Sequence, residues 1–499
     1  MYEPGFTEFE KLTQKGNLIP VYREILADVE TPVSVLMKLQ KKNHVYLLES
    51  VEGGEKWGRY SFLGTGAGVI FQIRGAEVII TERSNVTKKL HNGNPLQYLR
   101  ELLGRYKPVS VPGLPRFYGG AVGYLGYDMV RYFEKLPEGQ KDDLGVDESI
   151  FVISDSLLIF DNVRHTIKVV ACAFTEDGDS LEEVYAAACS KIADMIETLS
   201  LPAVHPEKDS ETAGGEVPFR SNMTEAQYET LVEKAKEYIA TGDIIQVVLS
   251  QRFEAAYSGN PVDLYRALRF INPSPYLFFL KLNDLVLIGS SPEVMVRLEE
   301  QTMELRPIAG TRRRGKTEQE DRHLADELLS DEKERAEHVM LVDLGRNDLG
   351  RVARVGSVQV NEYMVVEKYS HVMHLVSNVR AQLASGKDAF DVLTAAFPAG
   401  TLTGAPKIRA MEIIDELEPV RRGTYGGAVG YFSFSGNMDF CITIRTMLFK
   451  DGKIYIQAGA GIVYDSVPAY EHKESLNKAK AMLQAVGMAA GGFIIKNGK

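Results

Sequence analysis

Cysteine is scarce in this sequence. The 499 residues include three cysteines, Cys172, Cys189 and Cys441, and none has a partner at the spacing of a zinc-binding or redox pair. An odd and low count does not provide the framework of a small disulfide-stabilised secreted domain. Structural zinc and a disulfide scaffold are therefore excluded as the basis of the fold.

Long apolar runs and an excess of positive charge are also absent. No stretch approaches the about 18 apolar residues of a membrane-spanning helix, and the opening MYEPGFTEFEKL lacks the apolar segment of a signal peptide. The formal net charge of −11 argues against nucleic acid, because neutralising phosphates requires a basic face. A small anionic substrate needs only a local basic pocket. We expect a cytoplasmic protein with no membrane and no nucleic-acid partner.

The signatures of two widespread protein classes are missing. There is no G-x-S-x-G turn of a serine hydrolase and no G-x-x-x-x-G-K-[ST] loop of a nucleotide-binding protein. Histidine is rare, with nine in the chain, so each can be considered singly. His374 lies in the apolar run SHVMHLVSN, where a histidine is more typical of a protein core than of a catalytic site.

One shift in composition divides the chain. Residues 201–219 are rich in Pro, Gly, Ser and acidic residues and have almost no hydrophobic periodicity, which is typical of a linker or exposed loop. It separates an N-terminal region, 1–200, from a C-terminal region, 220–499. We find no internal repeat and no low-complexity tract.

Strand-like runs outnumber helical ones in both regions. Examples are SIFVISDSLLIFD (149–161) and QVVLSQR (246–252). Amphipathic helices are predicted at 180–199 and 223–243, the second with Thr224 and Gln227 in the pattern of a capping box. Short turns between the strands favour an α+β fold with antiparallel sheets over a doubly wound parallel fold.

Two predicted helices carry glutamates three residues apart. Glu334 and Glu337 lie in one, and Glu471 and Glu474 lie in the other. This spacing puts each pair on one face of its helix. Four such carboxylates on facing helices would suit Mg²⁺, although a solvated charged face accounts for either pair alone.

Glycine-rich turns form a second group of candidate sites. FPAGTLTGAPKIRAME (397–412) places Thr401 and Lys407 at the start of a predicted helix near Pro406, an arrangement that suits an anion. RPIAGTRRRG (306–315) puts three arginines after a glycine and also favours an anion. Each glycine-rich turn alone is more typical of a hairpin in which glycine adopts positive φ.

Taken in order, these segments resemble the chorismate-utilising enzymes. The matching stretches, between residues 290 and 480, are SPE, PIAGTRRRG, AEHVMLVDLGRNDLGRV, VMHLVS, AGTLTGAPKIRAME, RRGTYGGAVGY, IRT, QAGAGIVYDSVP and NKA. The similarity extends over essentially the whole chain and is greatest to the anthranilate-forming members. It implies a large antiparallel β-sandwich with surrounding helices and an active site in a cleft.

The resemblance implies a role for each candidate residue. Glu337 and Glu474 would hold Mg²⁺, with Glu334 and Glu471 supporting it through water. Glu293 would be a general acid with a raised pKa, and His374 would assist a later step or position the reactants. The residues implied in binding the dicarboxylate chorismate are Ala309, Gly310, Thr311, Thr401, Tyr425, Arg445, Gly459, Ala460, Gly461 and Lys478.

A second site is implied towards the N-terminus. LLES (47–50), GRYSFLG (58–64) and NPSPYLFF (272–279) resemble the elements of a feedback pocket for tryptophan in this family. Leu277 stands where many relatives have methionine, a substitution that conserves volume. The implied contacts of L-tryptophan, as an inhibitor, are Leu48, Glu49, Ser50, Asn272, Pro273, Ser274, Pro275 and Tyr276.

Two positions distinguish the branches of the family. Aminodeoxychorismate synthases have PIKGT, whose lysine attacks the ring, where this chain has Ala309. Isochorismate and salicylate synthases have a water-activating lysine where this chain has Gln246. The resemblance therefore implies direct attack of ammonia at C2 of chorismate, with formation of anthranilate and pyruvate. No cysteine lies in the G-x-C-x-G turn of a glutaminase, so a separate glutamine amidotransferase subunit is implied as the partner.

Two alternatives stay open. An enzyme that stops at 2-amino-2-deoxyisochorismate would share the substrate, the metal and the nucleophile. A non-catalytic subunit that only senses tryptophan would keep residues 47–50 and 272–279, although the complete set of acidic residues argues against it.

Overall fold

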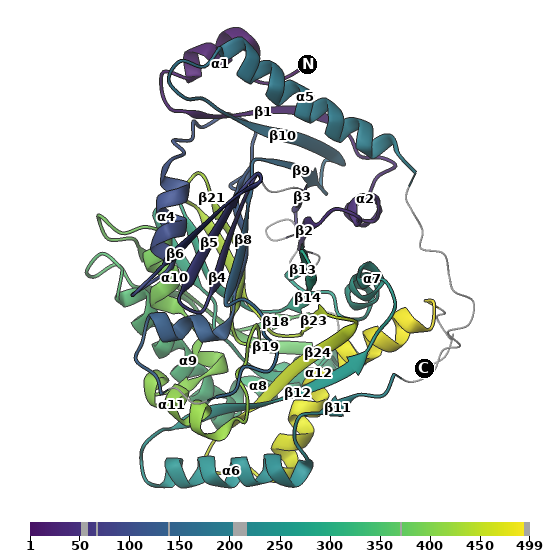
Figure 1. Ribbon diagram of the computed structural model, residues 1–499. Coiled ribbons are helices and arrows are strands. Elements are labelled where there is room, and N and C mark those ends of the chain that lie inside the picture. Colours follow the sequence, from purple (N-terminus) through teal and green to yellow (C-terminus); the bar gives the residue numbers. More distant parts are fainter. Residues whose placement is uncertain (51–57, 66–67, 138–139, 203–216, 370–371, 494–499) are drawn as a thin grey trace.

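Two large antiparallel sheets dominate the fold. The computed structural model describes residues 1–50, 58–65, 68–137, 140–202, 217–369 and 372–493, and Figure 1 shows how its elements are arranged. Within these residues each sheet has twelve strands. The expected α+β class and the antiparallel β-sandwich with surrounding helices are confirmed.

The strands of the first sheet come from both ends of the chain. In spatial order they are β1 (Leu18–Leu26), β10 (Thr166–Phe174), β9 (Ser156–Asp161), β3 (Tyr60–Thr65), β2 (His44–Glu49), β13 (Tyr276–Leu282), β14 (Leu285–Ser291), β23 (Thr446–Lys450), β24 (Lys453–Ile462), β12 (Gln246–Ala256) and β11 (Arg220–Ser221), with β20 (Gly404–Ala405) also on β12.

The second sheet also combines strands from both ends of the chain. Its order is β17 (Ile308–Arg313), β19 (Val372–Gln382), β16 (Thr302–Leu305), β15 (Val294–Glu299), β22 (Met438–Ile442), β21 (Ala428–Ser433), β7 (Gly120–Leu125), β8 (Ser149–Ser154), β4 (Val69–Arg74), β5 (Glu77–Glu82) and β6 (Asn85–Leu90), with β18 (Gln359–Lys368) also on β19. Strands from residues 1–200 and from residues 220–499 thus pair directly in both sheets. Most of the expected linker, at 203–216, lies outside the described residues.

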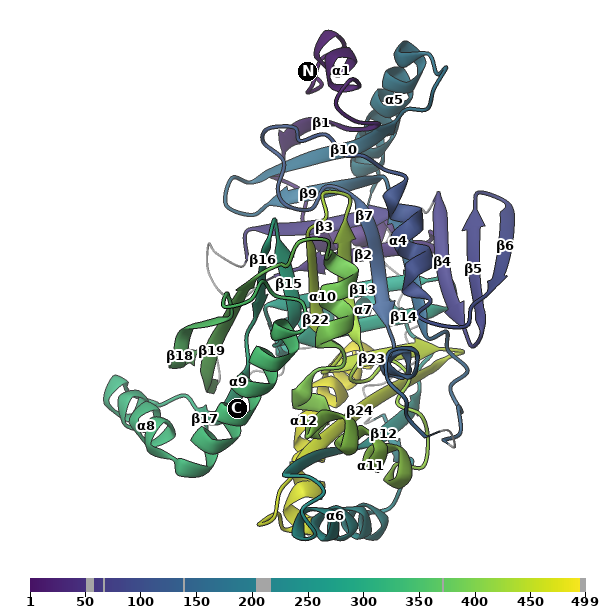
Figure 2. The ribbon, with the colours of Figure 1, turned by 90° about the vertical axis from the view of Figure 1, so that its left-hand side faces the viewer.

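The sheets pack face to face, and helices cover their outer surfaces. Phe62 and Phe278 of the first sheet share one apolar core with Phe151 and Phe432 of the second. The helices are α1 (Phe6–Leu12), α2 (Pro32–Leu39), α4 (Leu96–Gly104), α5 (Leu181–Ser200), α6 (Glu225–Ala240), α7 (Pro261–Ile271), α8 (Glu318–Ser330), α9 (Glu332–Gly350), α10 (Ala389–Ala396), α11 (Lys407–Leu417) and α12 (Pro468–Ala490), with short 3₁₀ helices η1 (Tyr127–Tyr132) and η2 (Gly400–Leu402). Figure 1 and Figure 2 show α5 beside β1 and β10 at one end of the molecule, with α6 at the other end and α12 running towards it from the middle. Among the described residues, no helix combines the length and apolar character that crossing a lipid bilayer requires.

Local sequence signals account for several helix ends. The Thr224 hydroxyl accepts from the N–H of Gln227 at 3.3 Å, and the Gln227 side chain accepts from the N–H of Thr224 at 2.8 Å. The predicted capping box is therefore present at the start of α6. Ser180 caps α5 in the expected helix at 180–199.

The chain crosses between the sheets at two adjacent points. β14 of the first sheet leads into β15 of the second, and β22 of the second leads into β23 of the first. The N–H of Ile442 donates to the carbonyl of Glu293, and the N–H of Ser290 donates to the carbonyl of Arg445, each at 3.1 Å. These bonds hold Glu293 and Arg445 together at the junction of the sheets.

Candidate active site

Glu293 is a buried carboxyl at the crossover from β14 to β15. Burial raises its pKa to about 8, although the Thr401 hydroxyl and the charges of Arg445 and Lys478 favour the ionised form. The Thr401 oxygen is itself buried and has no hydrogen bond of regular geometry to a described residue. The structure thus brings four predicted site residues together. A carboxyl that keeps its proton at neutral pH can serve as a general acid.

His374 lies on β19, opposite Thr311 of β17. Its Nδ1 is 2.9 Å from the carbonyl oxygen of Gly310 and 3.1 Å from the Thr311 hydroxyl. A carbonyl only accepts, so Nδ1 carries the proton and the lone pair lies on Nε2. Burial lowers the pKa of His374, and the charge of Arg445 acts in the same direction against the Gly310 hydrogen bond. The neutral ring can therefore accept a proton at Nε2.

Gly310 forms a β-bulge between Ala309 and Thr311. Its φ is +68°, and a Cβ there would lie 3.0 Å from the Leu328 side chain and 3.2 Å from Oε2 of Glu334. The bulge therefore requires glycine. It turns the Gly310 carbonyl towards His374 and lets Glu334 approach β17, while the buried Ala309 offers no reactive group.

The three arginines that follow do not form an anion site. Each is paired with carboxylates of α8, α9 or the residue between them, namely Arg312 with Glu327, Asp331 and Glu334, Arg313 with Glu320, and Arg314 with Asp321. The expectation of an anion-binding arginine cluster is therefore wrong. The positive charges are already neutralised, and they hold β17 against the two helices.

The four carboxylates predicted to bind a metal gather near the starts of α9 and α12. Burial raises the pKa of Glu337, and the charges of Glu334 and Glu474 raise it further. Burial also raises the pKa of Glu471, to which the charge of Glu474 contributes. Among the described residues, no three His, Cys, Asp or Glu side chains are arranged to hold a metal ion. The cluster is a concentration of partly buried negative charge without a formed metal cage.

Lys478 connects this cluster with the glycine-rich strand β24. Its Nζ lies 2.7 Å from the Glu474 carboxylate and donates to the carbonyl of Gly459 at 3.1 Å. Its charge also favours ionisation of Glu293 and Glu337. One lysine therefore lies between the general-acid candidate and the carboxylates.

Gly461 lets β24 approach the same region. A Cβ at this position would lie 2.6 Å from Nε2 of Gln246, whose side chain hydrogen-bonds Glu337. Sequence reasoning noted Gln246 only for its lack of charge, and its contact with a carboxylate was missed. The Ala460 side chain is buried in a core with residues of α6 and α11, so only its backbone can face a substrate.

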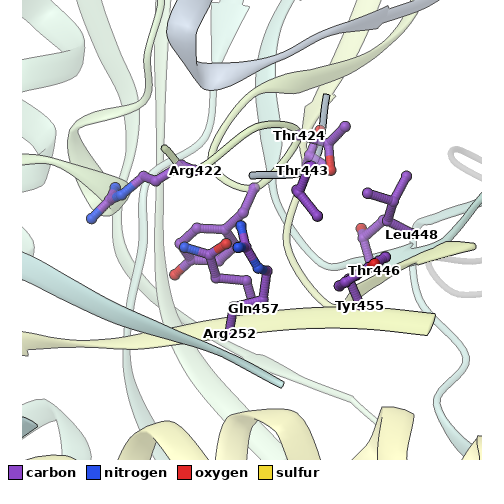
Figure 3. Close-up of a pocket in the computed structure, with 10 residues that line it drawn as sticks. Arg252, Arg422, Thr424, Thr443, Thr446, Leu448, Tyr455 and Gln457 are labelled. Atoms are coloured by element: carbon purple, nitrogen blue, oxygen red, sulfur yellow. The ribbon is translucent and has the colours of Figure 1, made fainter. Parts of the chain in front are cut away.

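Tyr425 lines a small cavity, shown in Figure 3. Two polar atoms of this cavity, Oγ1 of Thr443 and Oε1 of Gln457, are buried and have no hydrogen bond to a described residue. Such atoms mark polar space for water or a polar ligand group. Burial raises the pKa of Tyr425, so its hydroxyl stays protonated and can donate. In Figure 3 the guanidinium of Arg422 points away from Thr443.

A second cavity lies between the sheets beside the β2–β13 pair. Five residues of the predicted tryptophan set line it, namely Leu48, Glu49, Ser50, Pro275 and Tyr276. The other three, Asn272, Pro273 and Ser274, lie in the turn between α7 and β13. Asn272 and Ser274 hydrogen-bond Ser290 there.

Sequence reasoning missed the charged wall of this cavity. Asp439 accepts from Arg297 at 2.8 Å and from Arg116 at 3.1 Å. Each residue is a single charge in an ordinary strand or loop, and no local motif marks any of them. The apolar side chains of Leu48 and Leu277 also line the cavity, which therefore combines an apolar surface with a cluster of paired charges.

A family model described as chorismate binding enzyme matches residues 44–484. The chain belongs to this family. Anthranilate synthase component 1 of Aquifex aeolicus is 50% identical over 489 residues, covering 97% of each chain. The component 1 of Acetivibrio thermocellus is 47% identical over 490 residues, covering 97% of this chain and 99% of the relative.

Solved structures of similar proteins agree with the assignment to the chorismate-binding enzymes. Anthranilate synthase component I from Streptococcus pneumoniae has a TM-score of 0.75 and 38% identity, covering 92% of this chain and 99% of that one. The menaquinone-specific isochorismate synthase from Escherichia coli has a TM-score of 0.69 at 19% identity, covering 96% and 98%, and shows the fold alone. In the candidate site, Arg445 and Lys478 are the cations whose charges act on Glu293, whereas Arg312, Arg313 and Arg314 pair with carboxylates of α8, of α9 and of the residue between them.

Proposed function

We propose that this chain converts chorismate and ammonia to anthranilate and pyruvate, as the ammonia-using component of an anthranilate synthase. The observation that carries the proposal is the Glu293 carboxyl, which burial keeps protonated near neutral pH beside Arg445, Lys478 and Thr401. Hydroxide is a poor leaving group, so loss of the C4 hydroxyl of chorismate needs such an acid. The relatives named anthranilate synthase component 1 support the same substrate and product.

The enolpyruvyl carboxylate of chorismate is assigned to Arg445, Tyr425 and the backbone N–H of Gly461. Arg445 provides the charge, the protonated Tyr425 provides a neutral donor, and residue 461 has no side chain to keep the ligand from the strand. The Thr401 hydroxyl adds a donor beside Glu293. Together these groups fix the substrate so that its C4 hydroxyl faces Glu293.

The carboxylate cluster has the oxygen donors that Mg²⁺ prefers, although the described side chains form no metal cage. Glu337 and Glu474 would hold Mg²⁺, and Glu334 and Glu471 would support it through water. Burial raises the pKa of Glu337, and the charges of Glu334 and Glu474 add to the shift. This crowding of carboxylates is the reason to expect a cation, and an all-oxygen donor set is what Mg²⁺ prefers. When bound, the ion would neutralise the ring carboxylate of the substrate and stabilise the charge that develops on it.

The remaining steps follow from the residues that are present. Glu293 gives its proton to the departing C4 hydroxyl while ammonia adds at C2. The added nitrogen loses one proton to solvent. Neutral His374, with its lone pair on Nε2, then accepts the C2 proton while the C3–O bond breaks and the ring becomes aromatic. The enolpyruvyl group leaves as the enolate of pyruvate, which takes up a proton to give pyruvate. Ala309 excludes a covalent amine intermediate at that position. Gln246 excludes water activation by a lysine, and ammonia needs no base to act as nucleophile.

Two further assignments concern the source of the ammonia and the feedback inhibition of the enzyme. The three cysteines are Cys172, Cys189 and Cys441, of which two are buried, so we assign glutamine hydrolysis to a separate amidotransferase subunit. The cavity lined by Leu48, Glu49 and Tyr276 is assigned to L-tryptophan, as a feedback inhibitor.

The test is to incubate the purified chain with chorismate, Mg²⁺ and an ammonium salt at alkaline pH, without a partner, and to identify the product. Anthranilate, formed at a rate that tryptophan suppresses, is the expected result. Accumulation of 2-amino-2-deoxyisochorismate would keep the first step but overturn the product. No turnover with tryptophan still bound would make the chain a sensing subunit instead.

A further inference from the structure

The most deeply buried ion pair near the candidate site joins Arg422 to Glu418. The exposed fractions of the two side chains are 1% and 2%. Nη2 of Arg422 lies 2.6 Å and Nε 2.9 Å from the Glu418 carboxylate oxygens, so the contact is bidentate. Burying two charges costs free energy because both lose their contact with water. The groups that this ion pair holds in place therefore have to explain why it is buried here.

The guanidinium also donates to two backbone carbonyls. Nη1 donates to Leu402, the neighbour of Thr401, and Nη2 donates to Val248, each at 2.7 Å. Val248 is the strand partner of Gly461 in the β12–β24 ladder. Arg422 is therefore bonded to the segment that carries Thr401 and to the strand that positions Gly461.

The third contact of Arg422 is with Tyr425. The guanidinium carbon lies 5.5 Å from the centroid of the Tyr425 ring and 4.8 Å from that of Tyr127, so the cation lies among two aromatic rings. Figure 3 shows that the side chain is directed away from Thr443 on the opposite wall of the cavity. Arg422 thus contacts the ring of Tyr425, the backbone next to Thr401 and the backbone opposite Gly461. All three residues are implied in substrate binding.

Glu418 extends the arrangement along β12. Its Oε1 accepts from both the N–H and the hydroxyl of Ser250 at 2.8 Å. Ser250 is the strand partner of Gly459, whose carbonyl accepts from Lys478. Through Ser250, Glu418 is therefore connected to Gly459, the other glycine implied in substrate binding.

We propose that the Arg422–Glu418 pair is a positioning element for chorismate, which fixes Thr401, Tyr425 and the Gly459–Gly461 backbone relative to one another. The proposal rests on the proposed function, since it assigns these residues to substrate binding. Arg422 is not a catalytic residue, because its hydrogen bonds go to Glu418, Leu402 and Val248. Its effect reaches the substrate through the groups that it holds.

Arg422→Lys tests this directly. Lysine keeps the charge, but a single ammonium cannot reach Glu418 and both carbonyls in the planar geometry of a guanidinium. We expect the KM for chorismate to rise about tenfold or more, since a displacement of about 1 Å at a binding group can cost up to about 100-fold. The KM for ammonium is expected to stay within about twofold, because ammonia does not need the carboxylate contacts.

The matched control is Arg131→Lys. Arg131 forms a partly buried bidentate pair with Asp415, at 2.8 Å, and touches none of the implied substrate residues. This variant is expected to lose thermal stability with an unchanged KM for chorismate. A rise in KM equal to that of Arg422→Lys would show a general loss of structure and overturn the proposal.

A milder variant, Glu418→Gln, covers the case in which Arg422→Lys does not fold. It keeps the shape and one acceptor but removes the charge, so the KM for chorismate should rise by a smaller factor. A KM within about twofold of wild type in the folded variants would overturn the positioning role. Wild-type protein that makes no anthranilate would overturn the proposed function instead, so the two failures are distinguishable.

Discussion

The backbone N–H of Ser290 donates a hydrogen bond to the carbonyl of Arg445 at 3.1 Å. The Ser290 hydroxyl donates to the backbone carbonyl of Asn272 and accepts from the side-chain amide of Asn272. The Ser290 carbonyl accepts from the Ser274 hydroxyl. One residue therefore joins the turn beside the second cavity to the segment that carries Arg445. A ligand that shifts this turn can therefore act on the chorismate site through Ser290, near the end of β14.

Replacing Ser290 by alanine is expected to weaken feedback inhibition. The substitution removes the hydroxyl that anchors the Asn272 turn but keeps the backbone bond to Arg445. The tryptophan concentration for half-inhibition should therefore rise several-fold, while kcat with ammonium stays within about twofold. Steady-state assays over a range of tryptophan concentrations measure both quantities.

Ser433→Ala serves as the control for this change. Ser433 is a buried serine of β21 whose hydroxyl contacts Gly119 and Ser435, away from the Asn272 turn. Both variants should lose stability by the roughly 1–3 kcal/mol of a lost buried hydrogen bond. Equal sensitivity to tryptophan in Ser290→Ala and wild type would contradict the assignment.

The pH dependence of turnover should report Glu293. Its acid form is needed, and burial raises its pKa to about 8, so kcat at saturating free ammonia is expected to be level at lower pH and to fall as the pH rises through about 8. Glu293→Gln cannot donate, and we expect a loss of about 10²–10⁴-fold in kcat. A pH profile of Glu293→Gln with the same descending limb as wild type would assign that limb to another group.

The same pKa shift affects stability. The folded state holds the Glu293 proton more tightly than the unfolded chain, so folding stability falls as the pH rises from about 4.5 towards 8 and the penalty is complete above that value. Glutamine cannot ionise, so Glu293→Gln should lose less stability than wild type over this range. Thermal unfolding at pH 5, 6.5 and 8 compares the two proteins.

Removal of divalent cations should abolish turnover, and added Mg²⁺ should restore it. Glu474→Gln removes a charge from the cluster around Glu337, so the Mg²⁺ concentration for half-maximal rate should rise about tenfold or more. Titration calorimetry with MgCl₂ measures the same change without turnover. Glu332→Gln, on an exposed position of α9, is the control and should leave both values unchanged.

The Gly310 bulge offers a comparison of two glycines. Gly310→Ala meets both a positive φ and a Cβ contact 3.2 Å from Glu334, whereas Gly356→Ala meets a φ of +77° in open space. Both variants should lose roughly 1–2 kcal/mol of stability from the backbone alone. Only Gly310→Ala should also lose activity, by about tenfold or more, because the bulge orients His374. Equal activity of the two variants would remove that role from the bulge.

Features with a strong local signal were predictable from the sequence. The capping box of α6, the buried β12 strand and the antiparallel class follow from residue patterns within short windows. The resemblance placed Glu293, Thr401, Arg445 and Lys478 in one site, and the structure brings them together. Sequence order alone could not show why Glu293 stays protonated, because its burial depends on two crossovers far apart in the chain.

Other features were not predictable because they depend on pairing between distant segments. Asp439 meets Arg297 through the register of β15 and β22 and meets Arg116 from the segment before β7, and Arg422 reaches Val248 only after β12 is in place. For the arginines 312–314 a signal did exist. The first turn of α8 is acidic, with Glu318, Glu320 and Asp321. Acidic residues so close in sequence predict that the charges of arginines 312–314 are neutralised.

The interleaved sheets have a consequence for synthesis on the ribosome. The strands β1, β10, β9, β3 and β2 can pair as soon as residue 174 has emerged, but the free edge of β2 is covered by β13, and that of β7 by β21. At about 5–20 residues per second, β13 follows roughly 5–20 s later and β21 later still. During that interval the nascent chain presents two unpaired strand edges, the kind of surface that aggregates readily. Shielding of those two edges would therefore favour correct folding until the C-terminal strands are synthesised.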